Sequence, residues 1–386
     1  MVSRANKSIF ADWWWTVDKY LLSALIGLMV GGVVLSLAGS PAVAERLGLD
    51  SFFFFKRHVF FFVPAVAVMI ATSFLEPKQA RRLAFLLFVV MAGLMLATLV
   101  IGEEIKGARR WINLGPLSIQ PSEFMKPAFV VLAAWLFAEN VRRPDIPANI
   151  FAVLLLCMVA ALLIAQPDFG QTLLISIAWS ALFFLAGMPW LWIAGAVVIG
   201  AGGISAAYIT LPHVAGRIDR FLNPQSGDTF QVDTALESFL NGGWFGVGPG
   251  EGIVKRVLPD SHTDFIFAVA AEEFGIILCI LLVVMFGFVV LRGLSHSLRT
   301  DDAFNRLASA GLVILFGVQS VINMAVNLSL MPAKGMTLPF ISYGGSSMIA
   351  VAFEMGLVLA FTRRRPEPKR LLRGIEAIPG AAAGAA

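Results

Sequence analysis

The chain has 386 residues, of which 58% are hydrophobic and 14% charged, and its mean hydropathy is +0.81. These values exclude a soluble domain built on one core. The two cysteines lie in apolar stretches and provide no disulfide framework, and the four scattered histidines form no Cys/His metal site. The formal net charge of +4 fits cytoplasmic loops that face anionic lipid, so no nucleic-acid partner is expected.

Ten apolar stretches have the length that crosses a bilayer, which predicts an all-α integral membrane protein with about ten transmembrane helices. The first stretch lacks the small-residue cleavage site of a signal peptide and should remain as a helix. The expected spans are residues 20–38, 57–75, 83–101, 121–139, 149–166, 170–187, 190–211, 264–292, 305–330 and 344–362.

Loop charge predicts the orientation of these spans. With ten spans both termini lie on one side, and 17 of the 29 basic residues fall on that side, which favours the cytoplasm. We therefore divide the chain into a cytoplasmic interfacial segment (1–19), a ten-span membrane domain (20–362) and a tail (363–386). The tail is basic at first and then disordered in composition. Tryptophans at 13–15 beside Lys19 are expected to anchor the first segment at the membrane interface.

Cations and one acidic residue gather around the start of the fourth span. Arg109 and Arg110 precede it, and Glu123 and Lys126 lie in its first turns. Glu123 and Lys126 share a helix face because they are three residues apart, so one interpretation is an internal ion pair. The alternative is that Lys126, Arg109 and Arg110 present positive charge to an anionic lipid headgroup. Asp168 lies in the short connection between spans five and six.

Residues 212–263, between spans seven and eight, form the only long loop. Its apolar stretches argue against disorder, so we expect one ordered extracytoplasmic loop with an amphipathic helix around 234–241. Arg217, Arg220 and Lys255 are its candidate cations. The glycine-rich run 242–250 has neither the setting nor the Lys-Ser/Thr ending of a nucleotide loop. Its glycines are expected to allow tight turns beside a ligand or partner.

An acidic cluster follows His262 where the eighth span begins. Asp264 has two interpretations, a helix N-cap or a functional carboxylate at the membrane surface. Glu272 lies roughly 12 Å deeper along the helix, and both it and Glu273 must face protein or water. A structural ion pair is expected for at least one of these two glutamates.

The segment 332–347 is rich in proline, glycine and hydroxyl groups and contains Lys334, Ser342 and Ser346. Asn323 lies in the span before it. A polar segment of this kind at a membrane edge predicts a re-entrant or broken-helix element that lines a cavity. An ordinary turn is the alternative, but it does not explain the density of polar groups.

Four stretches together resemble the SEDS family (shape, elongation, division, sporulation). They are GARRWINLGPLSIQPSEFMK at 107–126, PDFGQT at 167–172, HTDFIFAVAAEEFG at 262–275 and PAKGMTLPFISYGGSS at 332–347. Lys334-Gly335 within the last stretch resembles the division branch of the family more than its elongation branch.

The resemblance implies a peptidoglycan glycosyltransferase that polymerises lipid II on the periplasmic face of the bacterial inner membrane, at the division septum. It also implies contact with the nascent glycan strand, membrane lipid, a division-specific class B penicillin-binding protein and other divisome membrane proteins. The matching catalytic aspartate is Asp264. The expected substrate-binding residues are Lys126, Glu123, Arg109, Arg110, Arg217, Arg220, Lys255, His262, Lys334, Ser342 and Ser346, and the expected supporting residues are Glu272, Glu273, Asp168 and Asn323.

The implied reaction inverts the anomeric carbon and needs one general base, for which Asp264 is the candidate. Cations would stabilise the departing undecaprenyl diphosphate. No protein metal site is visible, although a divalent cation such as Mg²⁺ could enter with the diphosphate. Two alternatives stay open, a lipid II flippase and a non-catalytic division scaffold. The gathering of charge on one outer side favours surface chemistry over a polar path through the membrane.

Overall fold

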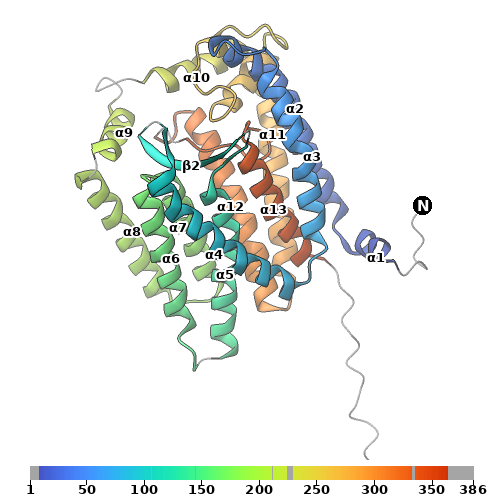
Figure 1. The fold of residues 1–386 in the computed structure, drawn as a ribbon, viewed down its shortest axis with the longest axis vertical. Helices are drawn as coiled ribbons and strands as arrows, with labels where there is room; N and C mark the ends of the chain where they lie inside the picture. Colours follow the sequence, from blue (N-terminus) through green and yellow to red (C-terminus); the bar gives the residue numbers. More distant parts are fainter. Residues whose placement is uncertain are drawn as a thin grey trace, which may run out of the picture.

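The computed structural model describes residues 8–105, 107–115, 117–143, 145–210, 212–223, 229–332 and 335–363. Over these residues the chain is a bundle of long helices with a small antiparallel sheet at one end (Figure 1). Lys334 and the predicted tail beyond Arg363 lie outside the described residues, as do the first seven residues.

Each of the ten expected spans coincides with one helix. These helices are α2 (Lys19–Arg46), α3 (Phe53–Ser73), α4 (Pro77–Ile101), α5 (Pro121–Arg142), α6 (Ala148–Ala165), α7 (Phe169–Leu185), α8 (Trp190–Thr210), α11 (Ile266–Leu298), α12 (Ala303–Asn327) and α13 (Gly345–Phe361). Among the described residues seven helices are long and apolar enough to cross a membrane, and α7 and α13 are shorter apolar helices. The multi-span membrane fold is therefore confirmed, and the count of ten spans stays a prediction.

Helices α5 and α12 form the centre of the bundle. In the most apolar stretch of each helix, 67% of α5 and 72% of α12 is buried. The same share is 22% for α4 and for α6, which leave most of their surface facing outward. Small residues permit this close packing: a Cβ added at Gly311 of α12 would meet Val130 of α5 at 2.8 Å. The polar residues on these central helices are consequently enclosed by protein.

A three-stranded antiparallel sheet departs from the all-α expectation. Its strands are β1 (Glu103–Ile105), β2 (Ala108–Leu114) and β3 (Leu117–Ile119), with β2 in the middle. Gly107 and Gly115 take positive φ angles of 77° and 66° in the two hairpin turns, which glycine tolerates without strain. The sheet fixes which side chains of β2 face the bundle, because successive residues of a strand point to opposite faces.

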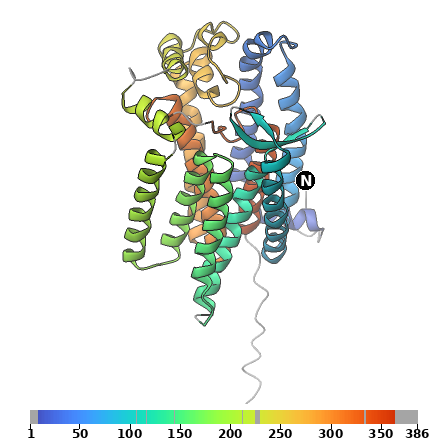
Figure 2. The same cartoon turned by 60° about the vertical axis from the view of Figure 1, so that its left-hand side comes forward.

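The described residues of the long loop contain two α-helices, where one was expected. Helix α10 (Phe230–Gly242) covers the helix expected around 234–241, and α9 (Pro212–Leu222) precedes it. A short 3₁₀ turn, η2 (Val254–Arg256), follows. Figures 1 and 2 place α9, α10 and the sheet at the same end of the bundle, opposite the connection between α5 and α6. Elements from distant parts of the sequence thus meet above the helix ends.

Helix α11 is broken at Gly275, where φ is 79° and ψ is 176°. The backbone groups freed by this break bond to the glycine-rich run of the long loop. Val247 N donates to Glu272 O at 2.9 Å, and Ile276 N donates to Gly243 O at 2.9 Å. The run therefore completes a broken helix, which satisfies backbone groups that could not stay unpaired next to lipid.

The amino-terminal helix α1 (Ile9–Thr16) lies beside the start of α2, at the end of α2 that is remote from α10 (Figure 1). Trp14 and Trp15 are exposed, and the Lys19 ammonium lies 4.9 and 4.6 Å from their ring centroids. Trp13 is buried and its Nε1 donates to Ser73 Oγ at 2.8 Å. This arrangement suits the interfacial role expected of the tryptophans.

Candidate active site

A cleft of about 880 Å³ opens at the end of the bundle that carries the sheet, α9 and α10. Its walls come from the start of α3, from β2, from the start of α7, from α9 and α10, and from the segments that precede α11 and α13. The charged and hydroxyl-bearing residues of its lining include Arg57, Arg110, Glu123, Asp168, Arg217, Arg220, Asp260, Asp264 and Ser347. Segments expected on the outer side of the membrane therefore share one cavity.

Asp264 lines this cleft but does not cap α11. The helix begins at Ile266, and its N-cap is Phe265, with no side-chain cap hydrogen bond. The N-cap interpretation of Asp264 is therefore wrong. The carboxylate lies against Gly335: a Cβ added there would come within 3.2 Å of Asp264 Oδ2. The cleft thus brings a carboxylate and a glycine of the 332–347 segment face to face.

Two asparagines of α12 hold the main chain of Asp264. Asn323 Nδ2 and Asn327 Nδ2 both donate to the Asp264 carbonyl at 2.9 Å. Asn327 Oδ1 also accepts from Ala268 N at 3.1 Å, which satisfies a donor in the first turn of α11. The two residues are four apart and share a face of α12. Asn323, predicted to be a supporting residue, and Asn327 thus both hold the main chain of Asp264.

The residues next to Asp264 are tied to the segment before α13. Ser342 Oγ donates to Thr263 O at 2.5 Å and accepts from Leu338 N at 2.7 Å. Tyr343 N donates to His262 O at 2.9 Å, and the His262 ring packs 4.3 Å from that of Phe54. Ser342 and His262, expected to bind substrate, instead build the wall behind Asp264.

Ser346 does not reach the cleft. Its hydroxyl is buried, and the neighbouring Ser347 lines the cavity in its place. Because the two serines start a helix, consecutive side chains point about 100° apart, and the sequence gives no sign of which one faces inward.

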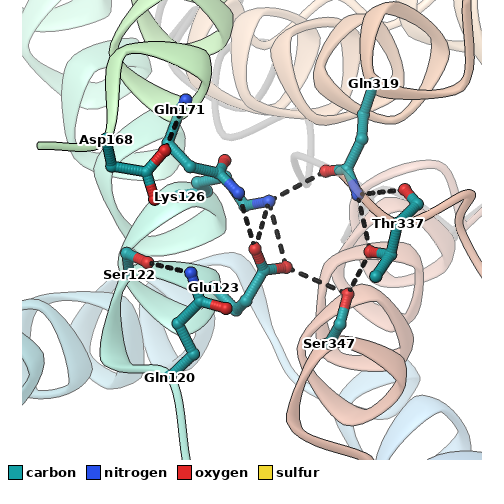
Figure 3. Close-up of polar contacts among 9 residues, drawn as sticks. All are labelled: Gln120, Ser122, Glu123, Lys126, Asp168, Gln171, Gln319, Thr337 and Ser347. Carbon is teal, nitrogen blue, oxygen red and sulfur yellow. Dashed lines mark hydrogen bonds and ion pairs between the residues drawn. The ribbon is translucent and has the colours of Figure 1, made fainter. Parts of the chain in front are cut away.

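Lys126 forms the internal ion pair (Figure 3). Its Nζ donates to both oxygens of Glu123 at 3.1 and 3.0 Å and to Gln319 Oε1 at 2.8 Å. Glu123 also accepts from Gln171 Nε2 at 2.8 Å and from Ser347 Oγ at 3.0 Å. Lys126 is only 1% exposed, and Glu123 faces the cleft. The lysine therefore neutralises a buried carboxylate instead of presenting its charge at the bilayer surface.

The two adjacent arginines of β2 have different surroundings. Arg110 faces the cleft, where Nε donates to Gln166 O at 3.0 Å and Nη1 lies 3.4 Å from Asp168 Oδ2. Arg109 lies on the other face of the strand, 48% exposed and 3.6 Å from Glu104. Arg109 therefore does not line the cleft, contrary to the expectation for it, and substrate binding by Arg110 stays a prediction.

Arg217 and Arg220 of α9 extend the positive wall that Arg110 begins. The pKa of Arg217 is lowered, first by partial burial of its guanidinium and then by the charges of Arg110 and Arg220. Arg217 remains a cation because an arginine side chain is protonated far above neutral pH. The three guanidinium groups line the same cleft, which makes it suited to an anion with several oxygens.

Asp168 supports this wall. It is the N-cap of α7, and its Oδ1 accepts from Gln171 N at 3.3 Å. Burial raises the pKa of this carboxyl, and the charge of Arg110 partly opposes that rise. The aspartate therefore joins the start of α7 to the Arg110 side chain.

Lys255 lies away from the cleft, in contrast to the expected substrate contact. Its Nζ forms an ion pair with Glu273 and donates to Ala38 O at 3.1 Å, and the residue is 3% exposed. Glu272 accepts from Val254 N at 2.7 Å and from Lys255 N at 2.8 Å, so it holds η2. The expected structural ion pair is thus made by Glu273.

Several residues at the site were not found from the sequence. Arg57 lines the cleft from the first turns of α3. Gln319, Asn323 and Asn327 repeat every four residues along the second half of α12, which is mostly apolar. That repeat is a usable signal, because polar side chains on one face of a membrane helix must meet protein. Gln171 and Ser347 gave no comparable signal.

Within the described residues, no three histidine, cysteine, aspartate or glutamate side chains gather closely enough to hold a metal ion. Glu123, Asp168 and Asp264 instead come from different walls of the cleft. These residues do not fit a protein-built cage for Mg²⁺.

The chain is similar to known proteins over nearly its whole length. A protein of Caulobacter vibrioides named "Probable peptidoglycan glycosyltransferase FtsW" is 46% identical over 365 residues, which cover 94% of each chain. A protein of the same name from Neisseria gonorrhoeae is 33% identical and covers 92% of this chain and 86% of its own.

Two solved structures share the fold. A chain of a peptidoglycan synthase complex that coordinates polymerization and crosslinking has a TM-score of 0.75 and 28% identity, covering 90% of this chain and 98% of its own. The rod shape determining protein RodA of Thermus thermophilus has a TM-score of 0.67 and 28% identity, covering 92% and 99%. The sequence model of the cell cycle proteins FtsW, RodA and SpoVE matches residues 19–367. The chain therefore belongs to the FtsW, RodA and SpoVE family of cell cycle proteins.

Proposed function

We propose that this protein is a division-type peptidoglycan glycosyltransferase that polymerises lipid II, with Asp264 as its general base. The observation that carries the proposal is the position of Asp264 in a cleft whose opposite elements supply Arg110, Arg217 and Arg220. The names of the FtsW relatives support the activity and the division role.

The proposed chemistry uses the Asp264 carboxylate and the arginines of the cleft. A sugar hydroxyl of one substrate attacks the anomeric carbon of the other, a new C–O bond forms, and the bond from that carbon to the diphosphate oxygen breaks. Asp264 takes the hydroxyl proton, and undecaprenyl diphosphate leaves. An α-linked donor and a β-linked product make this a single inverting displacement, which needs no covalent intermediate on the enzyme. General-base assistance of this kind typically contributes about 10²–10⁴-fold in rate.

The arginines would stabilise the charge that develops on the leaving diphosphate. Arg110, Arg217 and Arg220 present forked donors that match phosphate oxygens, and Arg57 adds a fourth cation to the cleft lining. Glu123 is neutralised by Lys126 and so does not repel the diphosphate. No step of this reaction is assigned to a metal ion.

The proposed setting is the bacterial inner membrane at the division septum, with both termini cytoplasmic and the cleft on the periplasmic side. The nascent glycan strand and membrane lipid are then the other molecules at the site. A division-specific class B penicillin-binding protein is the proposed partner, supported by the likeness to a chain of a polymerising and crosslinking complex. Further divisome membrane proteins are proposed as neighbours.

The flippase alternative requires a polar path through the bundle. The buried residues Lys126, Glu123 and Gln319 are instead bonded to one another through the Lys126 ammonium. Their charges and hydrogen bonds are therefore occupied, which favours chemistry in the cleft over passage of a headgroup. A scaffold role would require neither the carboxylate nor the arginine wall.

Reconstitution of the purified full chain in proteoliposomes with fluorescent lipid II separates the three functions. Polymerisation, with or without the added penicillin-binding protein, gives a ladder of glycan strands that lysozyme digests. A flippase would move intact lipid II between leaflets without a ladder, and a scaffold would do neither. Absence of a ladder in the presence of the partner would contradict the proposal.

A further inference from the structure

The hydrogen bonds around the Lys126–Glu123 pair close into a ring of five residues (Figure 3). Lys126 reaches Gln319 of α12, Gln319 reaches Thr337, Thr337 reaches Ser347 of α13, and Ser347 returns to Glu123. All except Thr337 are buried, and Glu123, Thr337 and Ser347 line the cleft, so the ring lies at the boundary between the cleft and the interior of the bundle. Only the ion pair was expected from the sequence.

The two charges fix the direction of every hydrogen bond in the ring. Lys126 can only donate, so the amide of Gln319 must turn its oxygen toward the ammonium. The amide nitrogen then faces Thr337 O, to which it donates at 3.0 Å. An ionised Glu123 can only accept, so Ser347 donates to it, and the Thr337 hydroxyl must donate to Ser347 Oγ at 2.8 Å. The chain of hydrogen bonds from Lys126 through Gln319 and the chain from Glu123 through Ser347 thus both end on Thr337.

Thr337 belongs to the short segment that faces the proposed base. Gly335, two residues earlier, lies against Asp264 Oδ2. Met336 O accepts from Asn323 Nδ2 at 2.6 Å, and the same amide bonds the Asp264 carbonyl. Successive carbonyls of the segment, at 336 and 337, are therefore held by amides one turn apart on α12.

We propose that Gln319 is a positioning residue for polymerisation: it uses the Lys126–Glu123 ion pair to hold segment 335–337 at a fixed place opposite Asp264. This inference rests on the proposed role of Asp264. Gln319 does not line the cleft, so it acts through Thr337 and not by touching substrate. A displaced segment changes the space beside the base, and misplacement by about 1 Å can cost on the order of 100-fold in rate.

Gln319→Glu and Gln319→Leu separate positioning from simple neutralisation of Lys126. The glutamate still accepts from Lys126, but its second oxygen faces Thr337 O without a proton. The leucine removes both contacts. Ser320→Ala is the matched control, because Ser320 is buried beside Gln319 and bonds only its own helix, at Phe316 O.

The full chain is assayed for lipid II polymerisation, and amide hydrogen exchange is measured over residues 335–343. We expect both Gln319 variants to lower kcat by about 10- to 100-fold while KM changes by less than about threefold. Exchange over 335–343 should rise in both, and Ser320→Ala should change neither quantity. A merely structural role would allow Gln319→Glu to keep wild-type kcat, because Lys126 stays paired.

Wild-type kcat or unchanged exchange in Gln319→Glu would overturn the positioning role, whatever Asp264 does. Normal polymerisation by Asp264→Asn, with raised exchange and low kcat in the Gln319 variants, would instead remove the base assignment and leave the positioning role intact. The two failures are thus distinguishable.

Discussion

Removal of the Lys126 ammonium should destabilise the protein more than removal of the whole ion pair. Lys126 and Glu123 are 1% and 3% exposed, and the carboxylate accepts four hydrogen bonds, two of them from the lysine. Lys126→Met has a similar length but no charge. It leaves a buried carboxylate unpaired, which typically costs about 3–5 kcal/mol.

The double variant Lys126→Met with Glu123→Gln removes the stranded charge. Replacement of a buried pair by neutral groups is often neutral for stability, so most of the loss should be recovered. The measurement is the unfolding midpoint of each purified variant in mixed micelles, with Glu123→Gln alone as the second arm of the cycle. A Lys126→Met protein as stable as the wild type would contradict this prediction, because it would show that the Glu123 carboxylate does not need the charge of Lys126.

The same variants separate stability from function. In the double variant nothing directs the Gln319 amide toward Thr337, so polymerisation should stay low although the protein is stable. Full activity of a stable double variant would reduce the pair to a structural role.

Three further predictions concern the arginine wall, Asp168 and the orientation. Arg110→Ala should lower kcat/KM for lipid II by about 100-fold, and Arg109→Ala on the opposite strand face should stay near wild type; equal losses in the steady-state assay would contradict the two-faced strand. Burial raises the pKa of Asp168 above its ordinary 3.8, so the stability linked to this carboxyl falls as pH rises between the unfolded and folded pKa values. Asp168→Asn keeps the cap, so at pH 7 it should melt at the same temperature as the wild type or at a higher one. This difference should vanish below pH 3.8. A lower melting temperature at pH 7 would show that the ionised carboxylate stabilises the folded state, which contradicts the raised pKa. In a cysteine-free background, an impermeant maleimide applied outside should label Glu251→Cys and not Asp301→Cys, both at exposed positions, and the opposite pattern would invert the membrane orientation.

The bilayer explains why the helices were predictable. A spanning segment must satisfy its own backbone, so an apolar run of sufficient length is almost forced to be a helix. Each of the ten predicted ranges accordingly coincides with one helix. The sheet was missed because strands of three residues, such as β1 and β3, carry too little alternation to be recognised.

The candidate site was only partly predictable, because partners in space are distant in sequence. Glu123 and Lys126 are three apart, and their pairing was one of the two stated interpretations. The third acceptor of Lys126 is Gln319, 193 residues away, and no local pattern indicates that contact. The sequence does not reveal the pairing of Lys255, because its partner, Glu273, lies 18 residues further on and beside the break at Gly275. The different surroundings of Arg109 and Arg110 could not be predicted, because the sequence does not reveal strand β2 and therefore which face each side chain takes.

Polymerisation of lipid II by Asp264→Asn tests the central claim most directly, with Asp260→Asn as its matched control. Both aspartates line the cleft, and asparagine tolerates the positive φ of 52° at position 260. The Asp264→Asn substitution keeps the size of the side chain and the backbone bonds to Asn323 and Asn327, but the amide cannot accept the hydroxyl proton. We expect Asp264→Asn to fold and to lose about 10²–10⁴-fold in rate, while Asp260→Asn should polymerise near the wild-type rate. A well-folded Asp264→Asn protein that polymerises as fast as the wild type would contradict this expectation.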